Sequence, residues 1–182
     1  MEIHQKTEKI WTVPNLLTSK ECDDLIIFSE QKGFSEADVG LSSGSKMMKN
    51  VRDNYRLIYE DQKLARNLED KFLGHSYFMV DAMPPLYLNE RFRFYRYETG
   101  QRFKRHIDGR VKKDHTQESR VTFMVYLNDD FSGGETTFEE LMIQPKKGMA
   151  LLFVHEQKHE SKPITDGVKY VLRSDIMYNC QS

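Results

Sequence analysis

His106-Ile107-Asp108 is the segment whose residue types most clearly suggest chemistry. On a β-strand, residues i and i+2 point to the same face, so His106 and Asp108 could bind one metal ion from neighbouring positions. The pair alone carries little weight, because an H-x-D is expected by chance about 0.4 times in a chain of this composition. A histidine from a later strand would complete the two-histidine, one-carboxylate triad that binds Fe(II) and leaves coordination positions open.

Two histidines compete for the third position, His155 and His159, within His155-Glu-Gln-Lys-His159. This stretch matches H-E-x-x-H, which on a helix places two zinc ligands on one face, with Glu156 as the general base of a metallopeptidase. The context argues against a helix, because residues 149–154 form a continuous apolar run that favours a buried strand. A zinc metallopeptidase is therefore kept as the alternative enzyme.

The elements that must position these residues differ between the two halves of the chain. Thr18 and Glu21 form a T-x-x-E capping box before a helix that should end at Gly33, and a second helix should follow Asp61 and end at Gly74. The Gly- and Ser-rich segment 40–45 is typical of a mobile loop. Strands are expected over residues 51–59, 91–97, 119–128, 135–138, 149–154 and 169–178.

Short strands separated by glycine-containing turns, without helices between them, favour an antiparallel sandwich or jelly roll. With two N-terminal helices covering one face, the fold class is α+β. No repeat, low-complexity tract or Pro/Gly-rich linker divides the chain. We therefore expect a single domain over residues 1–182, with helical support in 1–90 and the catalytic core in 91–178.

Composition excludes several classes of protein. The 182 residues include 27 Lys and Arg against 28 Asp and Glu, and this net charge of −1 argues against a nucleic-acid or anionic-membrane partner. No run is long and apolar enough for a membrane span and the first residues lack a signal sequence, so a cytoplasmic location is expected. Cys22 and Cys180 have no disulfide or zinc-site spacing.

Three motifs in order carry a resemblance to a known family. Residues 97–108 look like Y-x-x-G-Q-x-Y-x-x-H-x-D, with Phe103 where a tyrosine is usual. Residues 125–138 are similar to a Y-L-N…G-G-E-T-x-F hairpin, and His159 precedes Lys169 by ten residues. Together they resemble the Fe(II)/2-oxoglutarate dioxygenases of the prolyl 4-hydroxylase superfamily.

The resemblance covers residues 91–178 and implies a double-stranded β-helix with iron at its mouth on His106, Asp108 and His159. His155 would then lie outside the metal site. The cosubstrates would be 2-oxoglutarate and O₂, with ascorbate as a further candidate cofactor, and the products succinate, CO₂ and a substrate hydroxylated at an unactivated C–H bond. The carboxylate of Asp108 argues against a related halogenase. A prolyl residue in a peptide or protein is favoured weakly over a small molecule as substrate.

The family also binds the far carboxylate of 2-oxoglutarate with a basic residue on the last strand. Lys169 and Arg173 are both eligible, because alternate residues share a strand face. The family spacing selects Lys169, whereas the planar guanidinium fork favours Arg173, which could instead form a structural pair with Asp175. Tyr97 matches a tyrosine that hydrogen-bonds 2-oxoglutarate.

The candidates for substrate contact are Phe103, Asn54 and Arg56. Basic loops are also expected to flank the mouth, with Lys46, Lys49 and Arg52 in one and residues 110–113 in another. A nucleic-acid demethylase would share the iron chemistry, and the net charge argues against it. A non-catalytic jelly-roll binding module is the alternative outside the enzymes.

Overall fold

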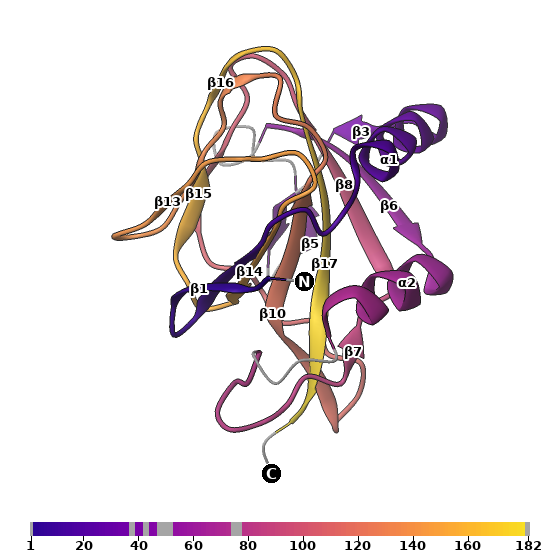
Figure 1. The fold of residues 1–182 in the computed structure, drawn as a ribbon, viewed down its shortest axis with the longest axis vertical. Helices are drawn as coiled ribbons and strands as arrows, with labels where there is room; N and C mark the ends of the chain where they lie inside the picture. The colour runs from indigo at the N-terminus through magenta and orange to yellow at the C-terminus, as the bar shows by residue number, and fades with distance from the viewer. Residues whose placement is uncertain (1, 37–38, 42–43, 47–52, 74–77, 181–182) are drawn as a thin grey trace.

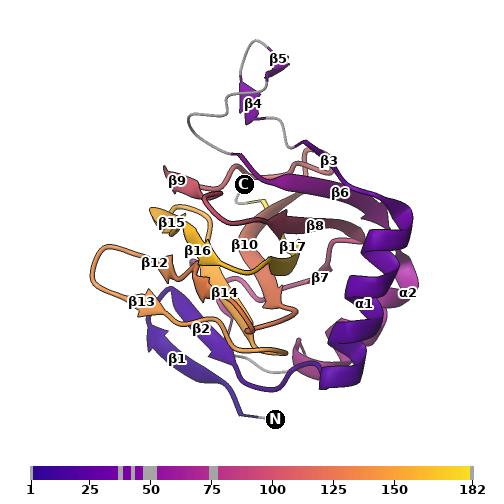
Figure 2. The same cartoon turned by 90° about the horizontal axis from the view of Figure 1, so that it is seen from above.

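The computed structural model describes residues 2–36, 39–41, 44–46, 53–73 and 78–180. This part of the chain is mostly β-sheet with two helices (Figure 1). A smaller sheet lies on one side of a large antiparallel sheet, and both helices lie on the opposite side of the large sheet (Figure 2). The expected combination of a sheet core with two N-terminal helices is confirmed.

The large sheet has the strand order β1-β2-β14-β10-β17-β8-β6-β3, and β7 also pairs with β17. Its two longest strands, β10 and β17, run side by side near its centre (Figure 1). Its strands are β1 His4–Thr7, β2 Ile10–Val13, β3 Ser35–Glu36, β6 Tyr55–Glu60, β7 Tyr87–Leu88, β8 Arg91–Tyr97, β10 Gln117–Tyr126, β14 Ala150–Val154 and β17 Lys169–Asn179.

The smaller sheet has the order β13-β12-β15-β9, and two further strand pairs stand beside it. Its strands are β9 Phe103–His106, β12 Thr136–Thr137, β13 Met142–Ile143 and β15 His159–Ser161. The separate pairs are β11 Ser132–Gly133 with β16 Ile164–Asp166, and β4 Val39–Leu41 with β5 Gly44–Lys46.

Side chains alternate between the two faces of the large sheet, and both faces are buried. On β8 and β17, Phe94 and Leu172 belong to the core beneath the helices. The adjacent residues Tyr95 and Val171 belong to a second apolar cluster, on the side of the smaller sheet. Burial on both faces explains why apolar residues follow one another directly in these strands, as at Phe94-Tyr95 and Val171-Leu172.

Both helices begin where their caps predict. Helix α1, Ser19–Lys32, has the full capping box, because the Thr18 side chain accepts from the Glu21 amide and the Glu21 side chain accepts from the Thr18 amide. Helix α2, Gln62–Phe72, is capped by Asp61, whose carboxylate accepts from the amide of Leu64 at 2.9 Å. The predicted end of the second helix, Gly74, lies outside the described residues.

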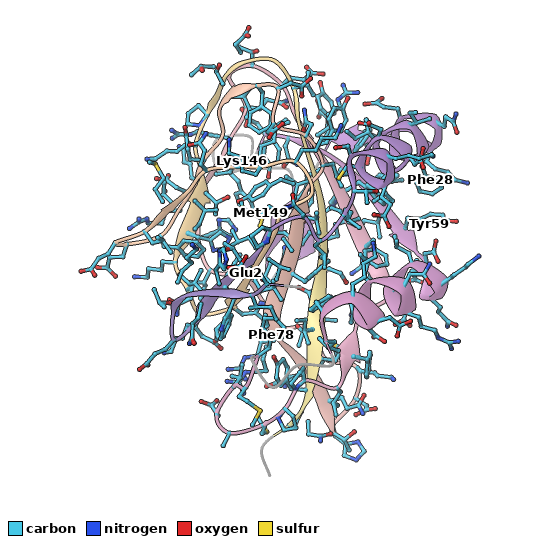
Figure 3. The ribbon with its side chains drawn as sticks, viewed as in Figure 1. Glu2, Phe28, Tyr59, Phe78, Lys146 and Met149 are labelled. Carbon is cyan, nitrogen blue, oxygen red and sulfur yellow. The ribbon has the colours of Figure 1, made fainter. Side chains whose placement is uncertain are left out.

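Aromatic side chains join the helices to the sheet. The Phe72 ring stacks on Phe123 of β10 with centroids 4.9 Å apart and planes 10° apart. Phe28 of α1 lies beside Tyr59 of β6, at 4.9 Å between centroids (Figure 3), and 5.9 Å from Phe94. These contacts hold both helices on the face opposite the smaller sheet.

The strand predictions differ from the structure in detail. Residues 91–97 match β8 at both ends, but β10 begins two residues before its predicted start. The loop expected over 40–45 is wrong where the chain is described, because β4 and β5 pair there. A two-stranded ribbon needs only backbone hydrogen bonds, so it leaves no side-chain periodicity to detect. Strands β1 and β2 were not predicted, although all four residues of β2 are buried.

No helix in the described part of the chain is long and apolar enough to cross a membrane.

Gly148 supplies a test of how the N-terminal segment is fixed to the sheet. Its φ is +80°, and an added Cβ would clash with the Leu17 carbonyl oxygen, whereas Gly100 has a φ of +89° with nothing within 4 Å of such a Cβ. We expect Gly100→Ala to lower the free energy of unfolding by roughly 1–2 kcal/mol, the cost of a left-handed residue. Gly148→Ala should lower it further in chemical denaturation. Equal losses in the two variants would contradict the close contact.

Candidate active site

A cavity between the two sheets collects most of the residues that the sequence singles out. Its empty volume, including the solvent-open part, is about 430 Å³. The lining residues come from both sheets and the loop after β9: Tyr95, Tyr97, Phe103, His106, Asp108, Thr122, Met124, Thr136, Phe153, His159, Ser161, Lys169, Val171 and Arg173.

Three potential metal ligands meet at this cavity: His106, Asp108 and His159. Strand β15 pairs with β9 so that His159 stands opposite His106. Asp108 Oδ1 lies 3.6 Å from His106 Nε2, and Asp108 Oδ2 lies 3.8 Å from His159 Nε2. One ligand atom from each of the three lies within 4.8 Å of the others, which is close enough to share one ion.

The position of Asp108 corrects one step of the sequence interpretation. Strand β9 ends at His106, so Asp108 is not the next-but-one residue of a strand. Its backbone lies beyond the β9–β15 pairing, and the Asp108 amide donates to the His155 carbonyl at 3.2 Å. The two side chains still converge, but by this contact rather than by strand alternation.

Both imidazoles are held so that Nε2 is the free nitrogen. His106 Nδ1 lies 2.7 Å from the Lys104 carbonyl and His159 Nδ1 lies 2.9 Å from the Gln157 carbonyl. Since a carbonyl only accepts, each Nδ1 carries a proton, which leaves Nε2 as the nitrogen that can bind a metal in the neutral ring. Burial lowers the pKa of His159 to about 4, which favours the neutral, ligand-competent ring.

Asp108 is held as a carboxylate. Burial alone would raise its pKa, but Arg173, with the two imidazoles, holds the pKa well below the usual range. An Arg173 guanidinium nitrogen lies 3.2 Å from Asp108 Oδ2, and the Thr122 hydroxyl donates to the same oxygen at 2.5 Å. The group is therefore charged and oriented before any ion binds.

Lys169 is the buried cation of the cavity. It is 1% exposed, and its ammonium donates to the Gly134 carbonyl and to Ser161 Oγ, at 2.5 Å and 3.0 Å. No carboxylate lies within 4 Å of it in the described ranges of the chain. Burial therefore lowers its pKa to about 7. Gly134 also makes room for it, since a Cβ there would lie 3.2 Å from Lys169 Cδ.

Arg173, the other eligible cation, already has carboxylate partners. It contacts Asp108 and Asp175, each at 3.2 Å, and Asp175 is also bound by Arg93 of β8 at 2.8 Å. Burial opposes its charge, but Asp108, Tyr95 and Asp175 together raise its pKa. The geometry thus separates two residues that the sequence left equivalent.

Tyr97 and Phe103 also line the cavity. Tyr97 is opposite Lys169 in the β8–β17 register, and the Lys169 ammonium lies 5.5 Å from the centre of its ring. The Phe103 ring stacks on His106, with centroids 3.5 Å apart. Phe103 is thus placed against a metal-ligand candidate.

The other substrate candidates are not among the residues that line the cavity. Asn54 is buried, with its amide donating to the Tyr55 carbonyl, and Arg56 opposes Tyr95 in the β6–β8 register. Lys49 and Arg52 lie outside the described residues, as does the side chain of Lys46.

The second basic loop is engaged with acidic side chains. Arg110 pairs with Glu118 and with Glu156, at 2.5 Å in both cases. Residues 111–113 lead from it into the turn before β10. Arg110 is therefore held at the surface next to Glu156 and is not among the cavity-lining side chains.

The H-E-x-x-H hypothesis is not supported. After β14 the chain turns, and His159 begins β15, so the motif does not lie on a helix. His155 is fully buried and contacts Ser119 and Thr122 instead of facing His159. The three-residue metal cluster among the described residues does not include it.

Thr122 and Ser161 contribute to the site without having been predicted. Thr122 lies in an apolar strand and Ser161 two residues after His159. A polar residue within the apolar run of β10 is the one sequence signal that could have marked Thr122, because a buried hydroxyl needs a partner.

Comparison with known proteins gives a family. The model of the 2OG-Fe(II) oxygenase superfamily matches residues 92–174. The chain is 26% identical over 156 residues to probable prolyl 4-hydroxylase 11 of Arabidopsis thaliana, covering 75% of this chain and 49% of the relative.

Two solved structures share the fold. The viral collagen prolyl hydroxylase of Paramecium Bursaria Chlorella virus-1, in complex with 2OG, has a TM-score of 0.66 at 23% identity, covering 93% of this chain and 96% of that one. A prolyl hydroxylase from Trichoplax adhaerens, bound to a peptide fragment of the hypoxia inducible factor oxygen degradation domain, has a TM-score of 0.70 at 18% identity, covering 95% and 84%.

Residues 92–174 of this chain therefore match the 2OG-Fe(II) oxygenase superfamily. This match confirms the resemblance inferred from the motifs, and the matched range includes all three metal-ligand candidates, His106, Asp108 and His159. The chain spans only about half the length of the plant relative.

Lys169 gives a prediction that needs no ligand. Because the pKa of Lys169 in the folded chain is about 7, far below the usual 10.5 of a lysine, the unfolded chain binds more protons between these values, and burial of Lys169 costs most at low pH. We expect Lys169→Met to be more stable than the wild type at pH 7, with the difference shrinking towards pH 10. Thermal unfolding at several pH values measures this.

The exposed Lys112 provides the control, since Lys112→Met should show no such pH-dependent difference. A gain for Lys169→Met that stayed constant from pH 6 to pH 10 would contradict the lowered pKa.

Proposed function

We propose that this chain is an Fe(II)- and 2-oxoglutarate-dependent hydroxylase that acts on an unactivated C–H bond and forms succinate and CO₂. One observation carries the proposal. A single cavity holds the convergent ligand atoms of His106, Asp108 and His159 and, on the large sheet, the buried ammonium of Lys169. A metal centre and an anion-binding cation in the same cavity match the needs of a metal-chelating dicarboxylate.

The donor set fits Fe(II). Two neutral imidazoles and one carboxylate form the facial triad that leaves the remaining coordination positions open. The Nδ1 contacts of His106 and His159 fix both rings before binding, as outer-shell hydrogen bonds do in metalloproteins. When bound, Fe(II) together with O₂ and 2-oxoglutarate supplies the oxidising power for C–H hydroxylation, and ascorbate is a candidate reductant.

Lys169 fits the far carboxylate of 2-oxoglutarate better than Arg173 does. Arg173 is already neutralised by two carboxylates, whereas the partners of Lys169 are a carbonyl and a hydroxyl. A carboxylate would therefore stabilise the ammonium that burial now destabilises. Tyr97, beside Lys169, would add a hydroxyl donor to the same carboxylate.

The cavity walls assist the reaction by excluding water. Phe103, Phe153 and Val171 place apolar surface around the metal cluster, and Phe153 lies 4.5 Å from the His159 ring between centroids. Such walls strengthen the electrostatic contacts inside and protect reactive species from side reactions. Asp108 and Arg173 keep the charges of the site fixed while reactants enter.

The two facing sheets are interpreted as a double-stranded β-helix, or jelly roll. In this proposal the whole chain, 1–182, is a single domain, with residues 1–90 supporting a catalytic core in 91–178. Support comes from the two solved structures, of which this chain covers 96% and 84%. The core would carry all three metal ligands together with Tyr97 and Lys169.

The substrate is proposed to be a prolyl residue of a peptide or protein. Prolyl hydroxylases are among the similar proteins, and one of them was solved with a peptide. Phe103 would contact the substrate next to the iron, because its ring stacks on His106. Arg56, which is half-buried on β6, would act farther out, where a peptide but not a small metabolite could reach, whereas the buried Asn54 would only support that strand through the Tyr55 carbonyl.

The first test is Fe(II)-dependent turnover of 2-oxoglutarate. His106→Ala, Asp108→Ala and His159→Ala should each lower succinate formation by more than the 10- to 100-fold typical of losing an outer-shell partner of a metal. His115→Ala, in an exposed turn, should have no effect and is the matched control. Wild-type protein that forms no succinate with Fe(II), or an Asp108→Ala variant with full activity, would contradict the proposal.

The second test identifies the substrate class. Proline-containing peptides, free amino acids and nucleic acids are incubated with Fe(II) and 2-oxoglutarate, and mass spectrometry detects the gain of one oxygen. We expect the peptides to be oxidised at proline, because the outer contacts of the site suit an extended chain. Oxidation of a free amino acid with every peptide unchanged would contradict the peptide assignment and leave the oxygenase chemistry in place.

A further inference from the structure

A chain of buried hydrogen bonds leads from the backbone to the carboxylate of Asp108. The amide of Val111 donates to Ser119 Oγ at 2.8 Å, and Ser119 Oγ lies 2.8 Å from His155 Nε2. His155 Nδ1 lies 2.9 Å from Thr122 Oγ1, which lies 2.5 Å from Asp108 Oδ2. Both ring nitrogens of His155 are thus used, although His155 is not a metal-ligand candidate.

The direction of these hydrogen bonds follows from the two ends. Asp108 is paired with Arg173 and only accepts, so Thr122 must give its single proton to Asp108. Thr122 can then only accept from His155, so His155 Nδ1 carries a proton. At the other end, Ser119 accepts from Val111 and has its own proton for His155 Nε2. Each donor in this series of hydrogen bonds therefore has one acceptor.

The side chain of Asp108 needs this support because the strand does not provide it. Strand β9 ends at His106, so no ladder fixes the backbone of Asp108. His155 holds it twice: the His155 carbonyl accepts from the Asp108 amide at 3.2 Å, and the His155 ring acts through Thr122 on the carboxylate. His155 is itself fixed to β10, since its amide donates to the Arg120 carbonyl at 2.9 Å.

The two oxygens of Asp108 consequently differ. Oδ2 accepts from the Thr122 hydroxyl, forms an ion pair with Arg173 at 3.2 Å and lies 3.8 Å from His159 Nε2. Oδ1 lies towards His106, at 3.6 Å from Nε2. Rotation of the carboxylate would break both contacts of Oδ2. The arrangement therefore fixes the orientation of the carboxylate between the two imidazoles.

We propose that His155 is a positioning residue of the metal centre, which acts through Thr122 to hold the Asp108 carboxylate in its orientation between His106 and His159. The inference rests on the proposed metal site and adds a residue that contacts neither metal nor substrate. It also gives the first histidine of the H-E-x-x-H stretch a role that does not involve ligation. Loss of such a partner typically weakens metal affinity by 10- to 100-fold.

Two substitutions of His155 separate positioning from simple packing. The Nδ2 atom of asparagine, attached to Cγ, takes the place of imidazole Nδ1, whereas the longer glutamine carries its amide near the place of Nε2. We expect His155→Asn to bind Co(II) within about threefold of the wild type and His155→Gln to bind it 10- to 100-fold more weakly. Glutamine fills the space better, so a packing role alone would give the opposite order.

A second pair of variants tests the same relay at Thr122. Thr122→Ser keeps the hydroxyl and should keep Co(II) affinity, while Thr122→Val keeps the shape and should lose 10- to 100-fold. Thr12→Val, at a buried threonine of β2 away from the cavity, is the control. The readout is the dissociation constant from titration followed by visible Co(II) absorption, with the unfolding temperature of each metal-free variant measured in parallel.

The outcomes distinguish the hypotheses. Wild-type affinity in both His155→Gln and Thr122→Val would overturn the positioning role while leaving the metal site intact. The positioning role would also be overturned, in favour of a structural role, if His155→Asn and His155→Gln lost Co(II) affinity equally and both had a lowered unfolding temperature without metal. A wild-type protein that binds no Co(II) or Fe(II) would instead overturn the proposed function, and the positioning role with it.

Discussion

The buried ion pairs of Arg173 join the candidate active site to the large sheet. Arg173 lies between Asp108 and Asp175, each 3.2 Å away, and Arg93 completes the row on Asp175 at 2.8 Å. An isolated charge would cost several kcal/mol in such an interior, and alternating signs with short contacts offset this cost. The metal cluster therefore depends on β17, although none of its three candidate ligands belongs to that strand.

Lys169 lies on the same face of β17 as Arg173, but its charge is not balanced by a carboxylate within hydrogen-bond distance among the described residues. Arg173 has its charge balanced within the chain, whereas the ammonium of Lys169 contacts only neutral oxygens at Gly134 and Ser161. The first arrangement is stable without ligand, and the second leaves a cation destabilised by burial until an anion arrives. One strand thus carries a charge that maintains structure and a charge that is available for binding, four residues apart.

The parts of this structure that could be predicted are those set by local sequence. The capping box at Thr18 and the Asp61 cap mark both helix starts, the continuous apolar run 149–154 marks β14, and aromatic residues alternating with arginines mark β8. The metal-ligand candidates follow from residue type together with the family spacing. Contacts between residues far apart in the chain could not be predicted, because a single sequence contains no distances. Arg173 and Lys169 were equally eligible to bind 2-oxoglutarate by sequence, and only the structure places two carboxylates beside Arg173. The departure of Asp108 from β9 was missed for the same reason, since it depends on a carbonyl 47 positions later, at His155.

The H-E-x-x-H stretch shows how backbone geometry decides what a motif does. On a helix, residues four apart share a face, and both histidines would meet one ion. Here the chain leaves β14, turns and enters β15. His155 therefore follows the end of β14 and is bonded to β10 through the Arg120 carbonyl, while His159 on β15 lies opposite His106 on β9. In the proposed metal site the two histidines therefore have different tasks, ligation for His159 and support of Asp108 for His155. Glu156, between them, is drawn to the surface by Arg110, which leaves no general base where a metallopeptidase would need one.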